Sequence, residues 1–209
     1  MVFRDRFEAG ELLAEALKEY AKDPDTIVLA LPRGGVPVAY VIAKRLGLPM
    51  DIFFVKKIPS PYNPEAAVGA VSENGLEYLN RRALMMLNIS RPYIEEQKRA
   101  ILDKIIQKRA LYGKSRIPVE GKRVILVDDG VATGASMYLA TKALKEEGAK
   151  EVIIAVPVAP AESLALLKEV ADKVVVLQVP MDFMAVGQYY EDFHQLSDEE
   201  VMDLLKDTP

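Results

Sequence analysis

Residues 124–136 read VILVDDGVATGAS and place four features in order along the chain. An apolar run, 124–127, ends at two adjacent acids, Asp128 and Asp129, and a small glycine-bearing loop follows them. Residues 136–147 then have the pattern of a helix. Backbone N–H groups at the start of such a helix can bind a phosphate, and carboxylates just upstream can bind hydroxyls of the sugar that carries it. The stretch therefore predicts a buried strand followed by a sugar-phosphate site.

The composition is typical of a globular protein with one sizeable core. Of the 209 residues, 50% are hydrophobic and 28% are charged, and the formal net charge is -4. This charge argues against a nucleic-acid partner, which usually meets a basic surface. The chain has no cysteine and one histidine, His194, which excludes disulfides, thiol nucleophiles and sites built from several histidines. No apolar run approaches the roughly 18–20 residues of a membrane span and no signal peptide is visible, so we expect a cytoplasmic protein without a membrane partner.

Apolar strands that alternate with helices predict an α/β fold with a mostly parallel central sheet and helices on both faces. The expected strands are 27–31, 51–55, 121–127, 152–156 and 174–177, with a hairpin of 67–72 and 76–79 around Asn74-Gly75. The expected helices are 7–20, 37–46, 91–114, 136–147 and 162–170. In the first helix, the residues expected to face the core are Phe7, Leu12, Leu13, Ala16 and Leu17.

The same pattern suggests how the chain is organised. Residues 1–177 are expected to form the core, which includes an irregular, flexible loop at 56–80 and the long charged helix at 91–114. Residues 178–209 form a tail that is rich in aromatic and acidic side chains.

Three distinctive loops follow predicted strands, at 32–36, 56–66 and 128–135. Ligands of parallel sheets bind at the carboxyl ends of the strands, so the three loops predict a single site. Gly34-Gly35 lets the backbone approach an anion, and Arg33 adds donors that suit phosphate oxygens. Lys56-Lys57 adds positive charge. Each signal alone is weak, since the Arg33-Gly34-Gly35 loop could be an ordinary turn and the two lysines mere surface charge. Together, the three loops suit a sugar with a phosphate at one end and a diphosphate at the other.

The stretch VILVDDGVATGAS closely resembles the phosphoribosyl diphosphate (PRPP) signature of type I phosphoribosyltransferases, and its Ala-Thr-Gly is most similar to the adenine-specific branch. Three further segments resemble parts of the same family. LPRGGVPVA is similar to its diphosphate loop, and KKIPSPYNPEAAVGAVSENG to the segment that holds its flexible catalytic loop. VGQYYEDFHQLSDEEV resembles the tail of a poorly characterised group of predicted phosphoribosyltransferases.

The resemblance implies the type I phosphoribosyltransferase core with a small C-terminal hood, and it assigns roles to residues of this chain. Asp128 and Asp129 would bind the ribose hydroxyls. Mg²⁺ would bridge diphosphate and ribose oxygens, without a cage of protein ligands, and a homodimer is expected. The 5-phosphate would be held by Val131, Ala132, Thr133, Gly134, Ala135 and Ser136, and the diphosphate by Arg33, Gly34 and Gly35, with Lys56 or Lys57.

The acceptor side is less well specified. Ala132 stands where the hypoxanthine and guanine branch of the family has an aspartate that can act as a base toward the purine. Glu65, in the flexible segment, is a speculative replacement, and the alternative is a loop acid that faces solvent. Phe183 and Tyr189 could stack on a nucleobase, and the alternative is that they pack the tail onto the core. The lone His194 is expected to be structural.

The resulting hypothesis is a Mg²⁺-dependent phosphoribosyltransferase that transfers a 5-phosphoribosyl group from PRPP to a nucleobase or similar nitrogen acceptor and releases diphosphate. Two alternatives stay open. One is a non-catalytic regulator that binds PRPP or a nucleotide, and the other is a phosphoribosyl hydrolase on the same scaffold.

Overall fold

The computed structural model describes residues 1–208, and its centre is a sheet of five parallel strands in the order β2-β1-β6-β7-β8. This confirms the expected α/β fold with a mostly parallel sheet. The inner strands are almost wholly buried, as expected for a parallel sheet covered on both faces. The strands are β1 (Thr26–Ala30), β2 (Met50–Ile52), β6 (Arg123–Val127), β7 (Glu151–Val158) and β8 (Lys173–Gln178).

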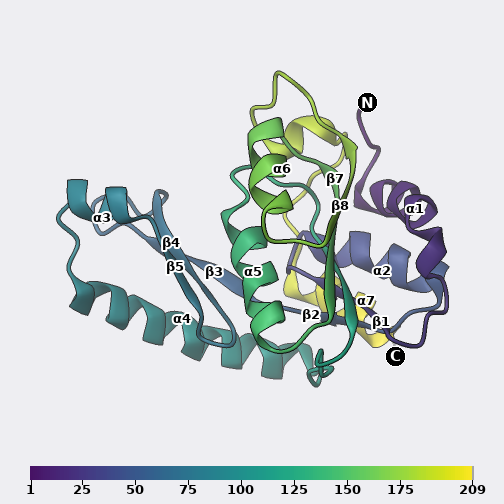
Figure 1. Cartoon of the computed structure of the whole chain (residues 1–209), viewed down its shortest axis with the longest axis horizontal. Coiled ribbons are helices and arrows are strands. Elements are labelled where there is room, and N and C mark those ends of the chain that lie inside the picture. The colour runs from purple at the N-terminus through teal and green to yellow at the C-terminus, as the bar shows by residue number, and fades with distance from the viewer. Residues whose placement is uncertain (209) are drawn as a thin grey trace.

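Helices cover both faces of this sheet (Figure 1). On one face, α1 (Arg6–Ala16) and α2 (Gly35–Leu46) pack over alternate residues of the central strands. On the other face, α5 (Ala135–Glu146) and α6 (Ala161–Lys168) pack over the remaining residues. The core therefore consists of two hydrophobic clusters, one on each face of the sheet. They are separate because successive side chains of a strand point to opposite faces.

The first helix does not use the face expected from its sequence. Phe7 and Leu12 are 42% and 41% exposed, whereas Ala9, Gly10, Leu13 and Ala14 are buried. A Cβ atom on Gly10 would lie 2.8 Å from Val41 Cβ, so these small residues let α1 approach α2 closely. The expectation was therefore wrong for Phe7, Leu12 and Ala16, all exposed, and is confirmed for Leu13 and Leu17, because backbone proximity between the two helices decides which face is buried. The helix also ends earlier than expected, at Ala16, before a short 3-10 turn at Lys18–Tyr20.

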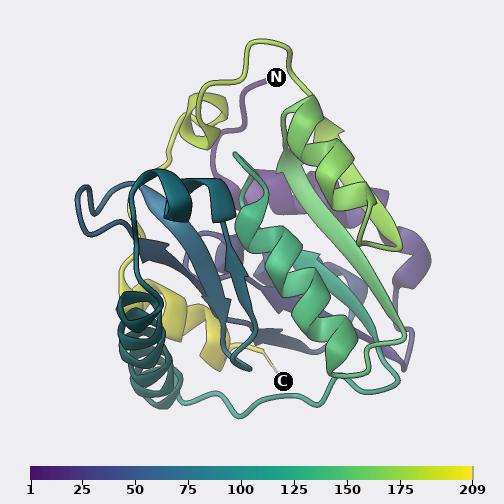
Figure 2. The same cartoon turned by 60° about the vertical axis from the view of Figure 1, so that its left-hand side comes forward.

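A smaller antiparallel sheet projects beside α5 (Figure 2). Its strands are β3 (Val55–Pro59), β4 (Ala67–Ser72) and β5 (Glu77–Leu79). The hairpin around Asn74-Gly75 is confirmed, but β3 lies in a segment expected to be irregular. A short helix, α3 (Arg81–Met86), leads to the long α4 (Arg91–Tyr112), which runs along this lobe.

The tail returns across the molecule in two parts. The 3-10 turn η2 (Val186–Tyr189) lies near the loop that follows β6, where Val186 meets Gly130. The helix α7 (Asp198–Lys206) packs against α2 and α4 and buries Val201 and Leu205 in the core. Its start is stabilised by a capping box between Ser197 and Glu200.

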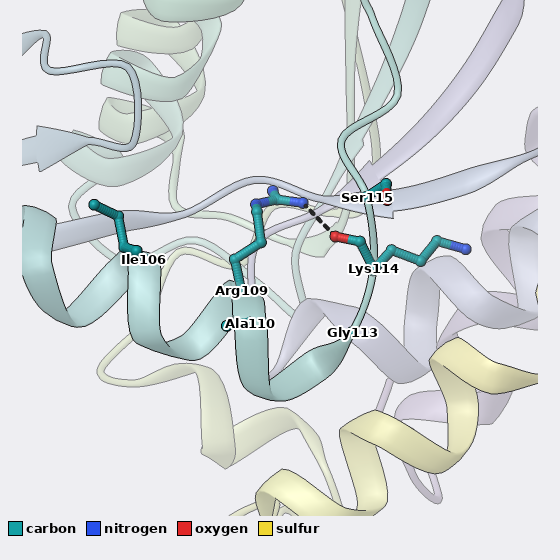
Figure 3. Close-up of a pocket in the computed structure, with 6 residues that line it drawn as sticks. All are labelled: Ile106, Arg109, Ala110, Gly113, Lys114 and Ser115. Atoms are coloured by element: carbon teal, nitrogen blue, oxygen red, sulfur yellow. Dashed lines mark hydrogen bonds between the residues drawn. The ribbon is translucent and has the colours of Figure 1, made fainter.

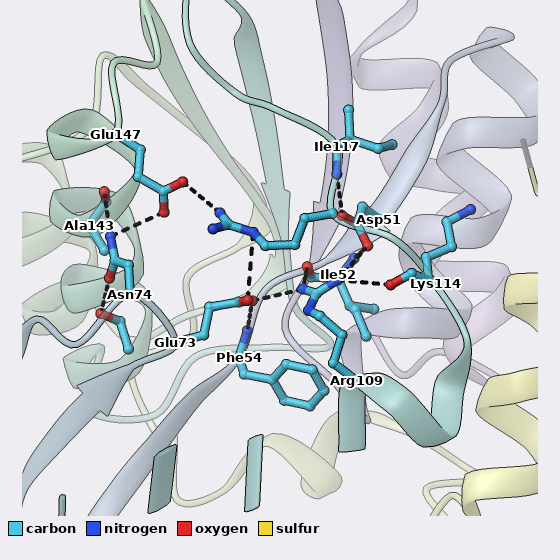
Figure 4. A network of polar contacts seen from close by, with 12 residues as sticks. Asp51, Ile52, Phe54, Glu73, Asn74, Arg109, Lys114, Ile117, Ala143 and Glu147 are labelled. Atoms are coloured by element: carbon cyan, nitrogen blue, oxygen red, sulfur yellow. Dashed lines mark hydrogen bonds and ion pairs between the residues drawn. The ribbon is translucent and has the colours of Figure 1, made fainter. Parts of the chain in front are cut away.

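A buried polar network fastens the lobe to the edge of the main sheet (Figure 4). Arg109 of α4 donates to Ile52 O at 2.7 Å and to Glu73 Oε1 at 2.8 Å, and lies 3.3 Å from Asp51 Oδ1. The side chains of Asp51 and Glu73 are only 2% and 5% exposed. Asn74 extends the network to α5 by donating to Ala143 O. The guanidinium therefore joins α4, β2 and the β4–β5 turn.

The end of α4 carries a pocket of about 380 Å³ on the outer side of this network (Figure 3). It is lined by Ile106, Arg109, Ala110, Gly113, Lys114 and Ser115. Arg109 Nη1 reaches across it to the carbonyl of Lys114 at 3.3 Å, so the pocket belongs to the anchoring of the helix end.

Replacing Arg109 with Met should destabilise the fold strongly, because buried Asp51 would lose the Arg109 cation and buried Glu73 would keep only the more distant Arg116, at 3.6 Å. Breaking a buried pair in this way typically costs about 3–5 kcal/mol. Urea unfolding measures the change in the free energy of unfolding. Arg99→Met, on an exposed position of the same helix, should stay within about 0.5 kcal/mol of wild type, and equal losses in both variants would contradict the role given to Arg109.

Candidate functional site

The acid pair and the Gly34-Gly35 loop are packed directly against each other. Strands β1 and β6 are parallel neighbours with Ala30 opposite Val127, so the loops after them meet at one edge of the sheet. A Cβ atom on Gly34 would lie 2.2 Å from Asp129 Oδ2, and one on Gly35 would lie 2.7 Å from Val127 O. Only glycine fits at both positions. The two loops predicted to share a site are therefore brought together.

Asp129 is turned into the protein, where it pairs with a residue that the sequence did not single out. Arg6 Nε lies 3.0 Å from Asp129 Oδ2, and their side chains are 8% and 12% exposed. Arg6 Nη1 donates to the carbonyl of His194 at 2.9 Å, and its guanidinium lies 4.2 Å from the ring centre of Phe193. Tyr190 donates its hydroxyl to Asp129 O at 2.6 Å. The ribose role expected for Asp129 therefore stays a prediction, and its carboxylate is engaged with Arg6.

Asp128 differs from Asp129 in both surroundings and charge. Burial raises the pKa of Asp128 well above its ordinary value, and the charge of Asp129 raises it further. Burial also raises the pKa of Asp129, but the charge and hydrogen bond of Arg6 act in the opposite direction. The charge of Asp129 is thus balanced by Arg6, whereas Asp128 forms no ion pair within residues 1–208 and lines the open cavity beside the loop.

The loop after the acids is anchored on one side and open on the other. The N–H of Val131 donates to Val158 O at 2.9 Å, so Val131 anchors the loop and its donor is already engaged. The hydroxyl of Ser163 donates to the carbonyl of Ala132. Gly134, with a φ of +89°, precedes α5 and supplies no side-chain cap. The first N–H groups of a helix lack intrahelical partners, so the start of α5 retains donors suited to an anion.

A cavity of about 230 Å³ joins these features. It brings together a carboxylate from Asp128, the start of α5, and a cation from Lys57 of β3. Val186 of the tail closes it, and sequence reasoning missed this residue because no local pattern marks an isolated valine as site-forming. The lining residues are Lys57, Asp128, Val186 and residues 130–137.

The structure separates the two lysines that were expected to act together. Successive residues of β3 point to opposite faces, and only Lys57 lines the cavity beside the loop. Lys56 lines a different cavity, together with Arg33. The Arg33 guanidinium lies 3.7 Å from Asp198 of α7, so the Arg33 side chain is directed away from the acid pair on which Gly34 packs.

A larger cavity of about 550 Å³ adjoins the loop on the side of the lobe. Lys57 and Thr133 line both cavities, so the two are neighbours. Glu65 is exposed and lines the larger cavity, as do Tyr78 and Tyr138, whose rings meet edge-on at 6.0 Å. Glu65 is therefore near the site, as expected, while its role in proton transfer stays a prediction.

The aromatic residues of the tail mainly pack on one another. Phe183 and Tyr189 stack at 5.7 Å with an interplanar angle of 13°, and Tyr189 is buried in a cluster with Phe3 and Tyr190. Neither Phe183 nor Tyr189 lines the two cavities beside the loop, and their contact with a base stays a prediction. His194 lies 2.8 Å from both Asp192 and Glu200, in keeping with a structural role.

The family model for the phosphoribosyl transferase domain matches residues 6–194. The chain belongs to the phosphoribosyltransferase family. Within this family, the chain is 38% identical over 206 residues to the Mycobacterium tuberculosis protein Rv0571c, which is provisionally named as a phosphoribosyl transferase. That match covers 98% of this chain and 46% of the relative, so the chain spans about half the length of the curated relatives it matches most extensively.

Two other comparisons agree with the family assignment. The amidophosphoribosyltransferase of Rhizobium etli is 31% identical over 145 residues, which cover 66% of this chain and 27% of that enzyme. The crystal structure of TT1426 from Thermus thermophilus superposes with a TM-score of 0.81 at 44% identity and covers 98% of both chains. The family assignment and the observed α/β fold therefore agree.

Two classes of feature are missing from the part of the chain that the structure describes. Within residues 1–208, no helix is both long and apolar enough to cross a membrane. In the same range, no cluster of three or more His, Cys, Asp or Glu side chains is arranged to hold a metal ion.

The two acids should respond in opposite ways when each is replaced by Asn. Asp129→Asn leaves Arg6 buried without a counter-charge and should lower the free energy of unfolding by about 3 kcal/mol. Asp128→Asn removes a carboxylate that burial disfavours, so it should raise the melting temperature at neutral pH. Thermal unfolding from pH 3 to pH 8 measures both changes.

The pH dependence of the gain in stability expected for Asp128→Asn follows from the raised pKa of the Asp128 carboxyl. The ionised carboxylate costs stability fully above its raised folded pKa, and the cost disappears as the pH falls below the unfolded value of about 3.9. The gain should therefore be largest at the alkaline end and absent at pH 3. A loss of stability in Asp128→Asn at pH 8 would show that Asp128 is a structural residue.

Proposed function

We propose that the protein transfers a 5-phosphoribosyl group from PRPP to a nucleobase or similar nitrogen acceptor and releases diphosphate. The observation that carries the proposal is the cavity that joins Asp128, the start of α5 and Lys57. It offers an anion-binding helix start, a carboxylate for hydroxyls and a cation at one place. These are the three kinds of group that a doubly phosphorylated sugar requires.

The substrate is placed by matching each of its groups to these donors and acceptors. The 5-phosphate lies on the N–H groups at the start of α5 and on the hydroxyls of Thr133 and Ser136. The ribose hydroxyls donate to Asp128, and Asp129 joins them if its pair with Arg6 opens. The diphosphate lies toward Lys57 and the backbone of Gly34-Gly35, where the absence of side chains leaves room for close approach.

The donor set suits Mg²⁺ held mainly by the substrate. Asp128 is the one carboxylate lining the loop cavity, and no larger acidic cluster occurs within residues 1–208. Mg²⁺ keeps several waters and commonly binds through one or two carboxylates and substrate phosphates. When bound, the ion would neutralise charge on the departing diphosphate, and Asp128 is the residue of this cavity that would help to hold it.

The reaction breaks the bond between the anomeric carbon and the diphosphate oxygen and forms a bond from that carbon to the acceptor nitrogen. Positive charge develops on the ribose and negative charge on the leaving diphosphate. Lys57 stabilises the leaving group, and Asp128 holds the ribose in place. The loop at 60–66, which carries Glu65, borders the site and would limit access of water.

The larger neighbouring cavity is the proposed binding place of the acceptor. Its volume of about 550 Å³ and its pair of tyrosines, Tyr78 and Tyr138, provide room and apolar surface for a ring. Ala132 has no group that can take a proton from the acceptor, so Glu65 is the nearest carboxylate with that capacity on this side. A contribution of this kind to the rate is typically about 10²–10⁴-fold.

One observation favours a second candidate, a regulator that binds PRPP or a nucleotide without turnover. That observation is the alanine at position 132, which leaves the loop able to bind a phosphate but without a base. A diphosphate-release assay with PRPP, Mg²⁺ and a panel of purines, pyrimidines and orotate separates the candidates. Release that depends on an acceptor supports transfer, release without one supports a hydrolase, and binding without release supports the regulator.

Light scattering during gel filtration tests the proposed homodimer.

Lys57→Ala should lower turnover by roughly 10²-fold, because it removes a charge that acts on the leaving diphosphate. The affinity for a nucleoside monophosphate, which lacks the diphosphate, should change far less. Steady-state kinetics and calorimetry measure the two effects. Lys168→Ala, an exposed lysine on α6, is the control and should leave both unchanged. Equal losses of turnover and monophosphate affinity in Lys57→Ala would contradict its role.

A further inference from the structure

The single histidine of the chain lies between two carboxylates of the tail. The Nδ1 atom of His194 is 2.8 Å from Asp192, and its Nε2 atom is 2.8 Å from Glu200, in the first turn of α7. A neutral imidazole has one N–H donor and one lone pair, whereas an ionised carboxylate only accepts hydrogen bonds. Both contacts can therefore form together only when the His194 ring carries its second proton.

The charges around the ring favour that protonated form. Hydrogen bonds to Glu200 and Asp192 raise the pKa of His194. The hydrogen bonds from His194 in turn lower the pKa of both carboxyl groups, and the charge of Arg6, on α1, lowers the pKa of Asp192 further. Near neutral pH both acids are therefore ionised, and a neutral ring would direct its lone pair at one of them.

Both carboxylates that meet the ring also belong to segments that hold the tail in place. One oxygen of Glu200 meets His194, while the other accepts the N–H of Ser197 at 3.1 Å in the capping box of α7. The N–H of Asp192 donates to Arg4 O at 3.0 Å, on the segment before α1. The imidazolium thus joins the start of α7 to a stretch of the tail that lies on the N-terminal segment.

The backbone of the same histidine reaches the buried ion pair. Arg6 Nη1 donates to His194 O at 2.9 Å, while Arg6 Nε lies 3.0 Å from Asp129. The ring of Phe193, the preceding residue, covers the Arg6 guanidinium at 4.2 Å. A ring fixed at both nitrogens restricts the position of the carbonyl that Arg6 uses, so the contacts of the ring and the contacts of Arg6 are coupled.

We propose that His194 is a proton-dependent clamp, which as the imidazolium holds the tail on Arg6 and on the start of α7 and as the neutral ring releases one of its two carboxylates. The clamp changes how firmly the tail lies over the cavity that Val186 borders. It does not depend on the proposed transferase activity, because neither the ring nor its two carboxylates line that cavity.

The clamp has a defined pH dependence. The pKa of His194 is raised in the folded protein above its unfolded value of about 6.5. Its stabilising effect is therefore complete below that unfolded value and is lost as the pH rises through the raised folded pKa. The tail is held most firmly in mildly acidic solution and is released in mildly alkaline solution.

Proton NMR titration of the full chain, prepared without a histidine tag, follows the clamp directly, because only one imidazole is present. The pKa of His194 should lie above about 6.5 in wild type. Asp192→Asn and Glu200→Gln should each lower it, since each replaces a charged acceptor by a neutral one, and Gln at position 200 can still cap α7. Glu199→Gln, at the preceding exposed position, is the matched control and should leave the pKa close to that of wild type.

Amide hydrogen exchange measures whether the ring holds the tail. The N–H of Glu191 donates to Phe3 O, and the N–H of Asp192 donates to Arg4 O, so these two amides monitor the contact between the tail and the N-terminal segment. At pH 6, both should exchange several-fold faster in His194→Gln than in wild type, and at pH 8.5 the two proteins should exchange alike. Comparison at equal pH cancels the intrinsic pH dependence of exchange, and melting temperatures identify a variant that has unfolded.

The titration and the exchange experiment can each overturn the proposal. A His194 pKa at or below about 6.5 in folded wild type, or one that is unchanged in both Asp192→Asn and Glu200→Gln, would show that the ring does not bridge the two acids. Exchange that is unaltered in His194→Gln at pH 6, or faster by the same factor at pH 6 and pH 8.5, would show that the proton of the ring does not hold the tail. A failure of the transferase proposal would appear in the diphosphate-release assay and would leave these outcomes unaffected.

Discussion

The buried ion pair between Arg6 and Asp129 organises this molecule around its site. Two charges removed from water must be paired and hydrogen-bonded, and here one arginine meets that requirement for three parts of the chain. It connects the first helix to the loop after β6 and, through the carbonyl of His194 and the ring of Phe193, to the tail. The pair also engages the carboxylate of Asp129, and so leaves Asp128 as the carboxylate that lines the cavity.

The same requirement for pairing of buried charges explains why the free site lowers the stability of the fold. Asp128 follows an almost wholly buried strand and lies beside another acid, and its charged form is disfavoured by desolvation and repulsion. A protein selected only for stability would place a neutral side chain there. In the proposed function, the hydroxyls of a bound sugar phosphate would compensate this carboxylate, so the cost of keeping it in the free protein would favour binding of the ligand.

A second constraint is the alternation of β3, which directs the two residues of one Lys-Lys dipeptide into two different cavities. Lys57 faces the loop after β6, and Lys56 faces Arg33, Lys108 and Asp198. The polar network around Arg109 holds the lobe against the sheet and thereby sets the position of β3 relative to both.

Local pattern in the sequence was enough to predict part of this structure. Apolar runs and helical spacing predicted the parallel sheet, and the distinctive loops at strand ends, 32–36, 56–66 and 128–135, predicted one shared site. The side chains that complete this site could be identified only from the folded chain. Arg6 and Asp129 are 123 positions apart, Val186 arrives from the tail, and α7 brings Asp198 to Arg33. Such partners are selected by three-dimensional packing and by the need to neutralise buried charge, neither of which leaves a periodic signal in the chain.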